Sequence, residues 1–316
     1  MRVLVVGGGA IGGITAAGMD ADVVVLDANE AHVAALRDPG LIINDGPPVA
    51  LDAVSSLDEL EGSFDVALVA VKSPLHDVAL PPLALRGGIG VFCSMGNGLI
   101  QDRMEAIVGK GNLLACIVEW GGSNIGPGRL VRDSLGGYMI GELDGTVSDR
   151  AKALASALEP IGHTQVVENV RGMIWSKLLI NSTFTGLSAV SGLRYGEAAS
   201  AGREAVFALW EEGVAVADAQ GLELVAIHGV DPHAFDLERL MEPMANVRPS
   251  MLQDLDAGRL TEVDVVNGGV VSKGREFGVP TPCNERVVEV VHSIERGERV
   301  SEPRWLGYVA EARAAR

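Results

Sequence analysis

The stretch that decides the fold is VLVVGGGAIGG, residues 3–13. Val3–Val6 form a short apolar run, as expected for a parallel strand covered on both faces. The glycines that follow are spaced as Gly7-x-Gly9-x-x-Gly12, and a helix opening there would direct its first backbone N–H groups at a phosphate. Because this motif stands between a strand and a helix, it predicts a dinucleotide-binding turn rather than a plain glycine-rich turn. The residues assigned to the dinucleotide are Gly7, Gly9, Ala10, Ile11 and Gly12.

Beyond this turn, short strands and helices alternate along the chain. The expected strands are Val23–Leu26, Phe64–Val71, Gly90–Cys93 and Thr164–Glu168, and the expected helices are Ile14–Ala17, Ala31–Arg37 and Ser148–Glu159, with Gly-rich strand segments across 113–141. After residue 169 the pattern is almost wholly helical, over Met173–Val190, Ala198–Gln220, Pro232–Met244 and Glu262–Phe277. We therefore expect an α/β Rossmann domain with a doubly wound, mostly parallel sheet at 1–168, which binds the dinucleotide, and an all-α catalytic and substrate domain at 169–316.

Composition excludes several classes of partner. A formal net charge of −17 argues against binding to nucleic acid or to an anionic membrane. No apolar run reaches the roughly 20 residues of a membrane span, and the apolar N-terminus fits a strand better than a signal peptide. Cys93, Cys116 and Cys283 form no CxxC pair, which favours reduced thiols in a cytoplasmic protein. A homodimer is one assembly that the sequence leaves open.

Asp27 ends the second expected strand, 15 residues after Gly12. An acidic side chain at this point can bond both hydroxyls of an adenosine ribose and repels a 2′-phosphate, so it favours NAD over NADP. The spacing is shorter than the usual roughly 20 residues, and a solvated loop aspartate is the alternative.

A polar stripe runs along one face of an otherwise apolar helix pattern. Lys177, Asn181, Thr185 and Ser188 fall at i, i+4, i+8 and i+11. A lysine in apolar surroundings gives up a proton more easily, and hydride delivery to a ketone leaves an alkoxide that needs both charge stabilisation and a proton. The stripe therefore makes Lys177 a candidate proton donor, with a lysine snorkelling at a helix edge as the alternative.

A second polar cluster follows a break at Gly258. By its residues alone, Thr261 or Glu262 starts the next helix, with Thr261 as cap and Glu262 as a favourable first-turn acid. His228 and His233 flank a turn and are interpreted as surface loop residues, and no metal site is expected.

Taken together, these residues resemble the ketopantoate reductase (2-dehydropantoate 2-reductase) family over nearly the whole chain. The matching motifs are Gly7-x-Gly9-Ala-Ile-Gly12, Val71-Lys72, Gly96-Asn97-Gly98-Leu99, Trp175-x-Lys177-Leu-x-x-Asn181, Ser250-Met-Leu-Gln-Asp254 and Thr261-Glu262-Val-Asp264. The resemblance implies a helical domain of the 6-phosphogluconate-dehydrogenase type and an active site between the domains. It implies Lys177 as general acid and Glu262 as its partner in binding and orienting substrate. It further places Asn97 near the nicotinamide, Lys72 beside the cofactor, and Asn181 and Ser250 on the oxygens of the substrate.

The chain also departs from the family pattern. Asp27-Ala28-Asn29 replaces the stretch that commonly carries an arginine for the NADP phosphate. Thr185 and Tyr195 stand where the family has two further asparagines, so both are candidate substrate-binding residues of altered chemistry. Arg194 is a candidate for local positive charge toward an anionic substrate.

We expect reduction of a small 2-oxo acid, 2-dehydropantoate first, to the 2-hydroxy acid. An NAD-dependent 2-hydroxyacid dehydrogenase acting on a different 2-oxo acid is the alternative. A non-catalytic NAD-binding sensor is disfavoured, since it has no need of Lys177 and Glu262.

Overall fold

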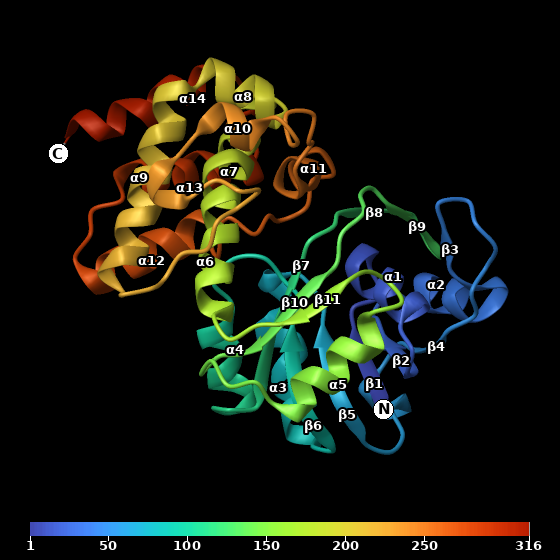
Figure 1. Cartoon of the computed structure of the whole chain (residues 1–316). Coiled ribbons are helices and arrows are strands. Elements are labelled where there is room, and N and C mark those ends of the chain that lie inside the picture. Colours follow the sequence, from blue (N-terminus) through green and yellow to red (C-terminus); the bar gives the residue numbers. More distant parts are fainter. Residues whose placement is uncertain (316) are drawn as a thin grey trace. The chain divides into compact units, whose positions relative to one another are not determined.

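The computed structural model describes residues 1–315 and divides into two compact units, each described separately (Figure 1). The first unit contains Met1–Gly96 and Ile100–Val170. The second contains Asn97–Leu99 and the chain from Arg171 onward. The roles given above to residues 1–168 and 169–316 stay predictions.

An eight-stranded sheet forms the centre of the first unit. Its strands, in spatial order, are β11 (Thr164–Val166), β10 (Tyr138–Glu142), β7 (Leu113–Val118), β6 (Ile89–Ser94), β5 (Phe64–Val69), β1 (Arg2–Val6), β2 (Asp22–Leu26) and β4 (Asp52–Val54). All neighbouring pairs are parallel except β10 with β7. The mostly parallel Rossmann sheet expected from the alternating pattern is confirmed.

Helices cover both faces of this sheet (Figure 1). Alternate strand residues such as Val3 and Leu68 pack with α1 (Ala10–Gly18), α2 (Glu30–Ala35) and α5 (Asp149–Leu158). The other face carries α3 (His76–Arg86) and α4 (Gln101–Val108). A three-stranded sheet of β3 (Ile42–Ile43), β9 (Arg129–Arg132) and β8 (Gly122–Gly126) packs beside α1. Short turns of 3-10 and π-helix complete the unit at Leu57–Glu59, Ser73–Leu75 and Leu36–Gly40.

The second unit is helical, as expected. Its helices are α6 (Val170–Ile180), α7 (Gly186–Ser191), α8 (Tyr195–Ala201), α9 (Arg203–Ala219), α10 (Leu237–Met241), α11 (Ser250–Asp256), α12 (Asn267–Phe277), α13 (Pro282–Glu295) and α14 (Arg304–Glu311), with 3-10 turns at Pro232–Ala234 and Ala312–Ala315. Phe184, Leu187 and Trp210 are buried in its core. Within residues 1–315, no helix combines the length and the apolar character needed to cross a membrane.

Several predicted helices are interrupted. A π-helical turn, Asn181–Thr185, separates α6 from α7. Gly202 separates α8 from α9, where the absence of a side chain leaves room for Leu306. The expected helix start at Thr261 or Glu262 is wrong: α12 begins at Asn267, because Glu262–Val266 form a tight turn in which the N–H groups of Val265 and Val266 both donate to Glu262 O. Helices α11, α13 and α14 were not individually predicted.

Candidate active site

The π-helical turn carries two of the predicted substrate residues, Asn181 and Thr185. The N–H group of Gly186 donates to Asn181 O, five residues back, which is the hydrogen bond of a π-turn. Asn181 is half-buried and Thr185 is buried. Because side chains four residues apart are neighbours on one side of a helical turn, both can reach one pocket.

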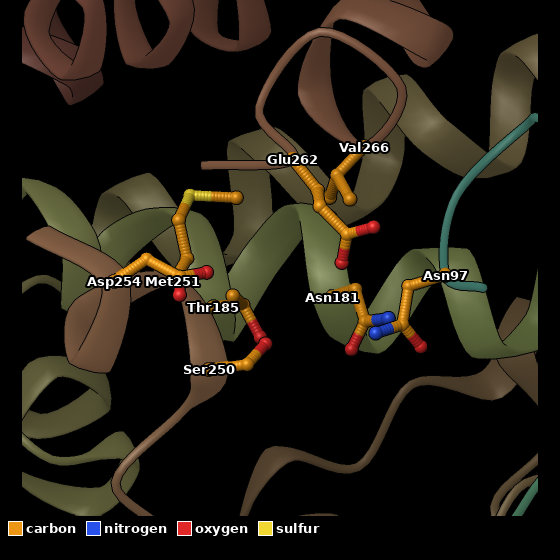
Figure 2. Close-up of a pocket in the computed structure, with 8 residues that line it drawn as sticks. All are labelled: Asn97, Asn181, Thr185, Ser250, Met251, Asp254, Glu262 and Val266. Atoms are coloured by element: carbon orange, nitrogen blue, oxygen red, sulfur yellow. The ribbon is translucent and has the colours of Figure 1, made fainter. Parts of the chain in front are cut away.

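A pocket lies in the second unit, and eight side chains line it (Figure 2). They come from four segments of the chain and are Asn97, Asn181, Thr185, Ser250, Met251, Asp254, Glu262 and Val266. Two carboxamides, two hydroxyls and two carboxylates therefore converge on a small space with only two apolar side chains. Such a lining suits a small ligand rich in oxygen atoms.

Five of the residues expected to bind or convert substrate meet in this pocket: Asn97, Asn181, Thr185, Ser250 and Glu262. Figure 2 shows the Glu262 carboxylate directed toward the side chains of Asn181 and Asn97. Lys177 is half-buried on α6, four residues before Asn181, and is not among the eight lining residues.

Asn97 reaches the pocket because of its glycine neighbour. Gly98 has φ +77°, and a Cβ there would overlap the Val265 carbonyl. The Leu99 N–H donates to the same carbonyl oxygen at 2.8 Å. Asn97–Leu99 is thereby attached to the turn that carries Glu262, although 165 residues separate Asn97 from Glu262 in the sequence.

Tyr195 and Arg194 lie outside the pocket lining. The Tyr195 hydroxyl is buried and lies 2.5 Å from the Thr185 hydroxyl, so it supports a lining residue from behind. Burial raises the pKa of Tyr195 to about 12. The Arg194 guanidinium is exposed and donates to Asn246 O at 2.7 Å.

Sequence reasoning did not assign Met251, Asp254 and Val266 to the site. Asp254 was quoted only as part of a motif, although Ser250, Met251 and Asp254 share one face of α11 by their i, i+1, i+4 spacing. The Asp254 carboxylate is buried and paired with the exposed Arg259 at 3.0 Å. This ion pair anchors the end of α11 that borders the pocket.

The glycine turn of the first unit is closely packed at Gly7 and Gly12 and open at Gly9. Gly7 has φ +98°, and a Cβ there would lie 2.7 Å from a Val71 methyl group. A Cβ at Gly12 would overlap the Gly7 carbonyl oxygen. By contrast, a Cβ at Gly9 would meet no atom within 4 Å, so the turn is open at the point where backbone must approach a ligand. No side chain caps the start of α1, which begins at Ala10 and Ile11.

Asp27 follows β2, and its carboxylate is hydrogen-bonded to this turn. Its carboxylate accepts hydrogen bonds from Gly8 N at 2.8 Å and Asn29 N at 2.9 Å, one on each oxygen. Each carboxylate oxygen keeps a lone pair for another donor, such as a ribose hydroxyl. Lys72 is half-buried at the start of the 3-10 turn that follows β5.

Two buried histidines that sequence reasoning missed hold the backbone of these segments. His32 accepts from Gly128 N at its Nδ1 (3.0 Å), so its Nε2–H donates to Gly8 O (2.7 Å). His76 Nε2 lies 3.2 Å from Val71 O, and burial lowers its pKa. Elsewhere, His233 bonds Asp218 at 2.8 Å rather than contributing to either site.

The Rossmann sheet, its open glycine turn and the polar pocket together define a nicotinamide-dependent oxidoreductase. Comparison with known proteins identifies the family. The model for ketopantoate reductase PanE/ApbA matches residues 3–145, and that for the ketopantoate reductase PanE/ApbA C terminal matches residues 169–295. The chain belongs to the ketopantoate reductase family.

Individual relatives agree with this assignment. The chain is 31% identical over 235 residues to a 2-dehydropantoate 2-reductase of Archaeoglobus fulgidus, covering 74% of this chain and 77% of the relative. A PanE/ApbA family ketopantoate reductase from Ralstonia eutropha JMP134 has a similar structure, with a TM-score of 0.79, 27% identity and coverage of 94% and 99% of the two chains. D-mandelate dehydrogenase, solved with NADH and anilino(oxo)acetate, shares the fold at 24% identity and a TM-score of 0.80, over 95% of this chain and all of its own.

Proposed function

We propose that this protein reduces a small 2-oxo acid to the 2-hydroxy acid, with 2-dehydropantoate as the first candidate. The observation that carries the proposal is the convergence of Asn97, Asn181, Thr185, Ser250 and Glu262 on one pocket. The amides and hydroxyls offer hydrogen-bond donors for the carboxylate and carbonyl oxygens of such a substrate. The family relationship supports the same reaction class.

The reduction needs one proton for the carbonyl oxygen, and Lys177 is the proposed donor. The nicotinamide cofactor, when bound, supplies a hydride to the carbonyl carbon. The carbonyl oxygen keeps the electron pair of the former π bond and takes a proton from the Lys177 ammonium, which solvent then restores. We assign Glu262, as the partner of Lys177, to binding and orienting the substrate. Asn181 and Ser250 are assigned to the substrate oxygens, and Asn97 to the neighbourhood of the nicotinamide.

We assign the dinucleotide to Gly7, Gly9, Ala10, Ile11 and Gly12, with Lys72 beside it. NAD is the preferred form in this proposal, because the Asp27 carboxylate is fixed at the turn by two backbone N–H groups. A carboxylate held there accepts ribose hydroxyls and repels a 2′-phosphate. We expect a lower KM for NADH than for NADPH in steady-state kinetics, and a clear NADPH preference would contradict this assignment.

A different 2-oxo acid is the second candidate substrate. The observation that favours it is the buried Thr185–Tyr195 hydroxyl pair, which replaces amide groups of the family pattern. A hydroxyl offers fewer hydrogen bonds than a carboxamide, so selectivity among 2-oxo acids is expected to change. The Arg194 guanidinium stays a proposed source of positive charge for the incoming anion.

Steady-state kinetics with 2-dehydropantoate and a panel of 2-oxo acids, each with NADH and NADPH, test the function directly. The highest kcat/KM identifies the substrate, and failure to reduce any 2-oxo acid would overturn the proposal. We propose the cytoplasm as the compartment, since the buried Cys93 and Cys116 thiols form no disulfide.

A further inference from the structure

A chain of buried polar side chains leads from α9 to the π-helical turn of the pocket. Glu212 of α9 accepts hydrogen bonds from Cys283 N (2.9 Å), Asn284 N (3.0 Å) and Asn284 Nδ2 (2.8 Å). Asn284 Oδ1 accepts from Asn267 Nδ2 at 2.9 Å, and the same Nδ2 donates to Ser182 O at 2.8 Å. Glu212, Asn267 and Asn284 are each at most 2% exposed.

The carboxylate fixes the direction of every bond in this chain. Glu212 Oε2 accepts from both the backbone N–H and the Nδ2 of Asn284, so the Asn284 amide presents its nitrogen to Glu212. Its Oδ1 then faces Asn267, which donates a hydrogen bond to it from Nδ2. The orientation of both amides is therefore imposed by the network, and the Asn267 amide can only donate toward Ser182.

Asn267 joins two walls of the pocket. On one side it bonds Ser182 O. In a regular α-helix this carbonyl would accept from Gly186 N–H, but here Gly186 N–H donates to Asn181 O. On the other side Asn267 directly follows Val266, which lines the pocket together with Glu262. One amide group thus ties the turn of Asn181 and Thr185 to the turn of Glu262.

Gly186 makes room for this amide. A Cβ at Gly186 would lie 2.8 Å from Asn267 Oδ1 and 3.0 Å from its Nδ2. The backbone of Gly186, at φ −61° and ψ −50°, is ordinary right-handed helix, where alanine is preferred to glycine. Backbone conformation therefore does not require a glycine here, whereas the Asn267 side chain does.

We propose that Asn267 is a positioning residue that sets the separation between the Asn181–Thr185 turn and the Glu262–Val266 turn for binding of the 2-oxo acid. This inference rests on the proposed function for the identity of the ligand. The residue acts through lining side chains and leaves the dinucleotide turn of the first unit untouched.

Two substitutions test it from opposite sides. Asn267→Asp keeps the shape but sets an oxygen against the oxygens of Ser182 and Asn284. Gly186→Ala adds a methyl group against the Asn267 amide. Because small displacements at a substrate site have large kinetic effects, we expect KM for 2-dehydropantoate, or for the best 2-oxo acid of the panel, to rise roughly tenfold to hundredfold in both. KM for the nicotinamide cofactor is expected to stay within about twofold.

A readout that needs no substrate accompanies the kinetics. Amide hydrogen exchange across residues 181–187 is expected to accelerate in both variants, because the Ser182 carbonyl loses its partner. Val290→Ala, which removes buried methyl groups from α13, is the matched control. It is expected to lower Tm with KM for the oxo acid and exchange at 181–187 unchanged.

The outcomes separate the two proposals. Wild-type KM and wild-type exchange in Gly186→Ala overturn the role of Asn267, whether or not Asn267→Asp folds. A lower Tm with unchanged KM in both variants reduces Asn267 to a purely structural residue, and also overturns it. If the wild type reduces no 2-oxo acid, the proposed function fails, while the exchange experiment still decides whether Asn267 holds the turn.

Discussion

The glycine turn of the first unit and the polar pocket of the second are built in opposite ways. The turn lies within residues 7–12 and depends on side chains that are absent, since Gly7 and Gly12 have no room for a Cβ. The pocket draws on residues from Asn97 to Val266 and depends on polar side chains that are present. The first site is a backbone surface, and the second is an assembly of functional groups.

The two sites should therefore be sensitive to different kinds of substitution. Backbone in the turn is held by His32 and by tight packing, so added atoms should do the damage there. In the pocket, removal or rotation of a single polar group should suffice, because the lining side chains come from four separately positioned segments. Substitutions in the turn and in the pocket should therefore differ in their effects on stability, cofactor binding and substrate binding.

Lys177→Ala should have the largest effect of all, and it should slow the chemical step without weakening cofactor binding. Loss of a general acid typically lowers the rate by about 10²- to 10⁴-fold, and we expect this loss in kcat. NADH affinity, measured by fluorescence titration, should stay within about twofold because the turn is untouched. Lys152→Ala, at an exposed lysine of α5, is the control and should retain wild-type turnover. Wild-type kcat in Lys177→Ala would refute the assignment.

Gly9→Ala and Gly12→Ala should differ from each other within the same turn. The methyl group of Gly9→Ala enters open space, so the free energy of unfolding should change by about 1 kcal/mol or less while NADH affinity falls at least about tenfold. Gly12→Ala overlaps the Gly7 carbonyl oxygen and should also lose about 1–3 kcal/mol of stability. Thermal unfolding and NADH titration measure both quantities. Unimpaired NADH binding in Gly9→Ala would contradict the ligand assignment.

His32→Gln should weaken cofactor binding through the backbone. It removes the link between Gly8 O and Gly128 N, which we expect to cost about 1–3 kcal/mol of stability and to raise KM for NADH several-fold. KM for the oxo acid should not change. His163→Gln, at an exposed histidine, is the matched control. An equal rise in both KM values for His32→Gln would show that the two sites are not independent.

Each unit contains a buried tyrosine bonded to a threonine, which gives a matched pair of small effects. Tyr195 bonds Thr185 of the pocket, and Tyr138 bonds Thr15 of α1 at 2.9 Å. Tyr195→Phe should raise KM for the oxo acid by about two- to fivefold, since it frees the Thr185 hydroxyl to rotate. Tyr138→Phe should leave that KM unchanged. Equal KM values in the two variants would remove Tyr195 from the support of the pocket.

The same pair predicts a pH dependence of stability. Burial raises the pKa of Tyr138 and of Tyr195 from 10.0 to about 12, so the unfolded chain loses these protons first. Their contribution to the free energy of unfolding is therefore full below pH 10 and lost as the pH rises through about 12. Each Phe variant should show a smaller fall in Tm between pH 9 and 11.5 than the wild type, and an equal fall would contradict the burial argument.

Prediction from the sequence succeeded where structure is local. The apolar strands, the glycine turn and the change from alternating to helical patterns follow from residues close together in the chain, and the corresponding sheet and helical unit are observed. Prediction failed where a contact with a residue far away in the sequence interrupts a helix. No pattern within residues 173–190 predicts the π-turn, because its Ser182 carbonyl is bonded by Asn267, 85 residues away.

Local patterns in the chain were therefore enough to predict the Rossmann turn, the two-part architecture and the polar residue types of the site. Three features depend on folding: which of those residues share a pocket, the position of Tyr195 behind Thr185, and the support that His32 and Asn267 give to the backbone of the two sites. The difference arises from the separation along the chain of the residues that interact. Strand patterns, glycine conformations and helix faces are fixed by neighbours along the chain, whereas a buried hydrogen bond takes whichever partner folding brings to it.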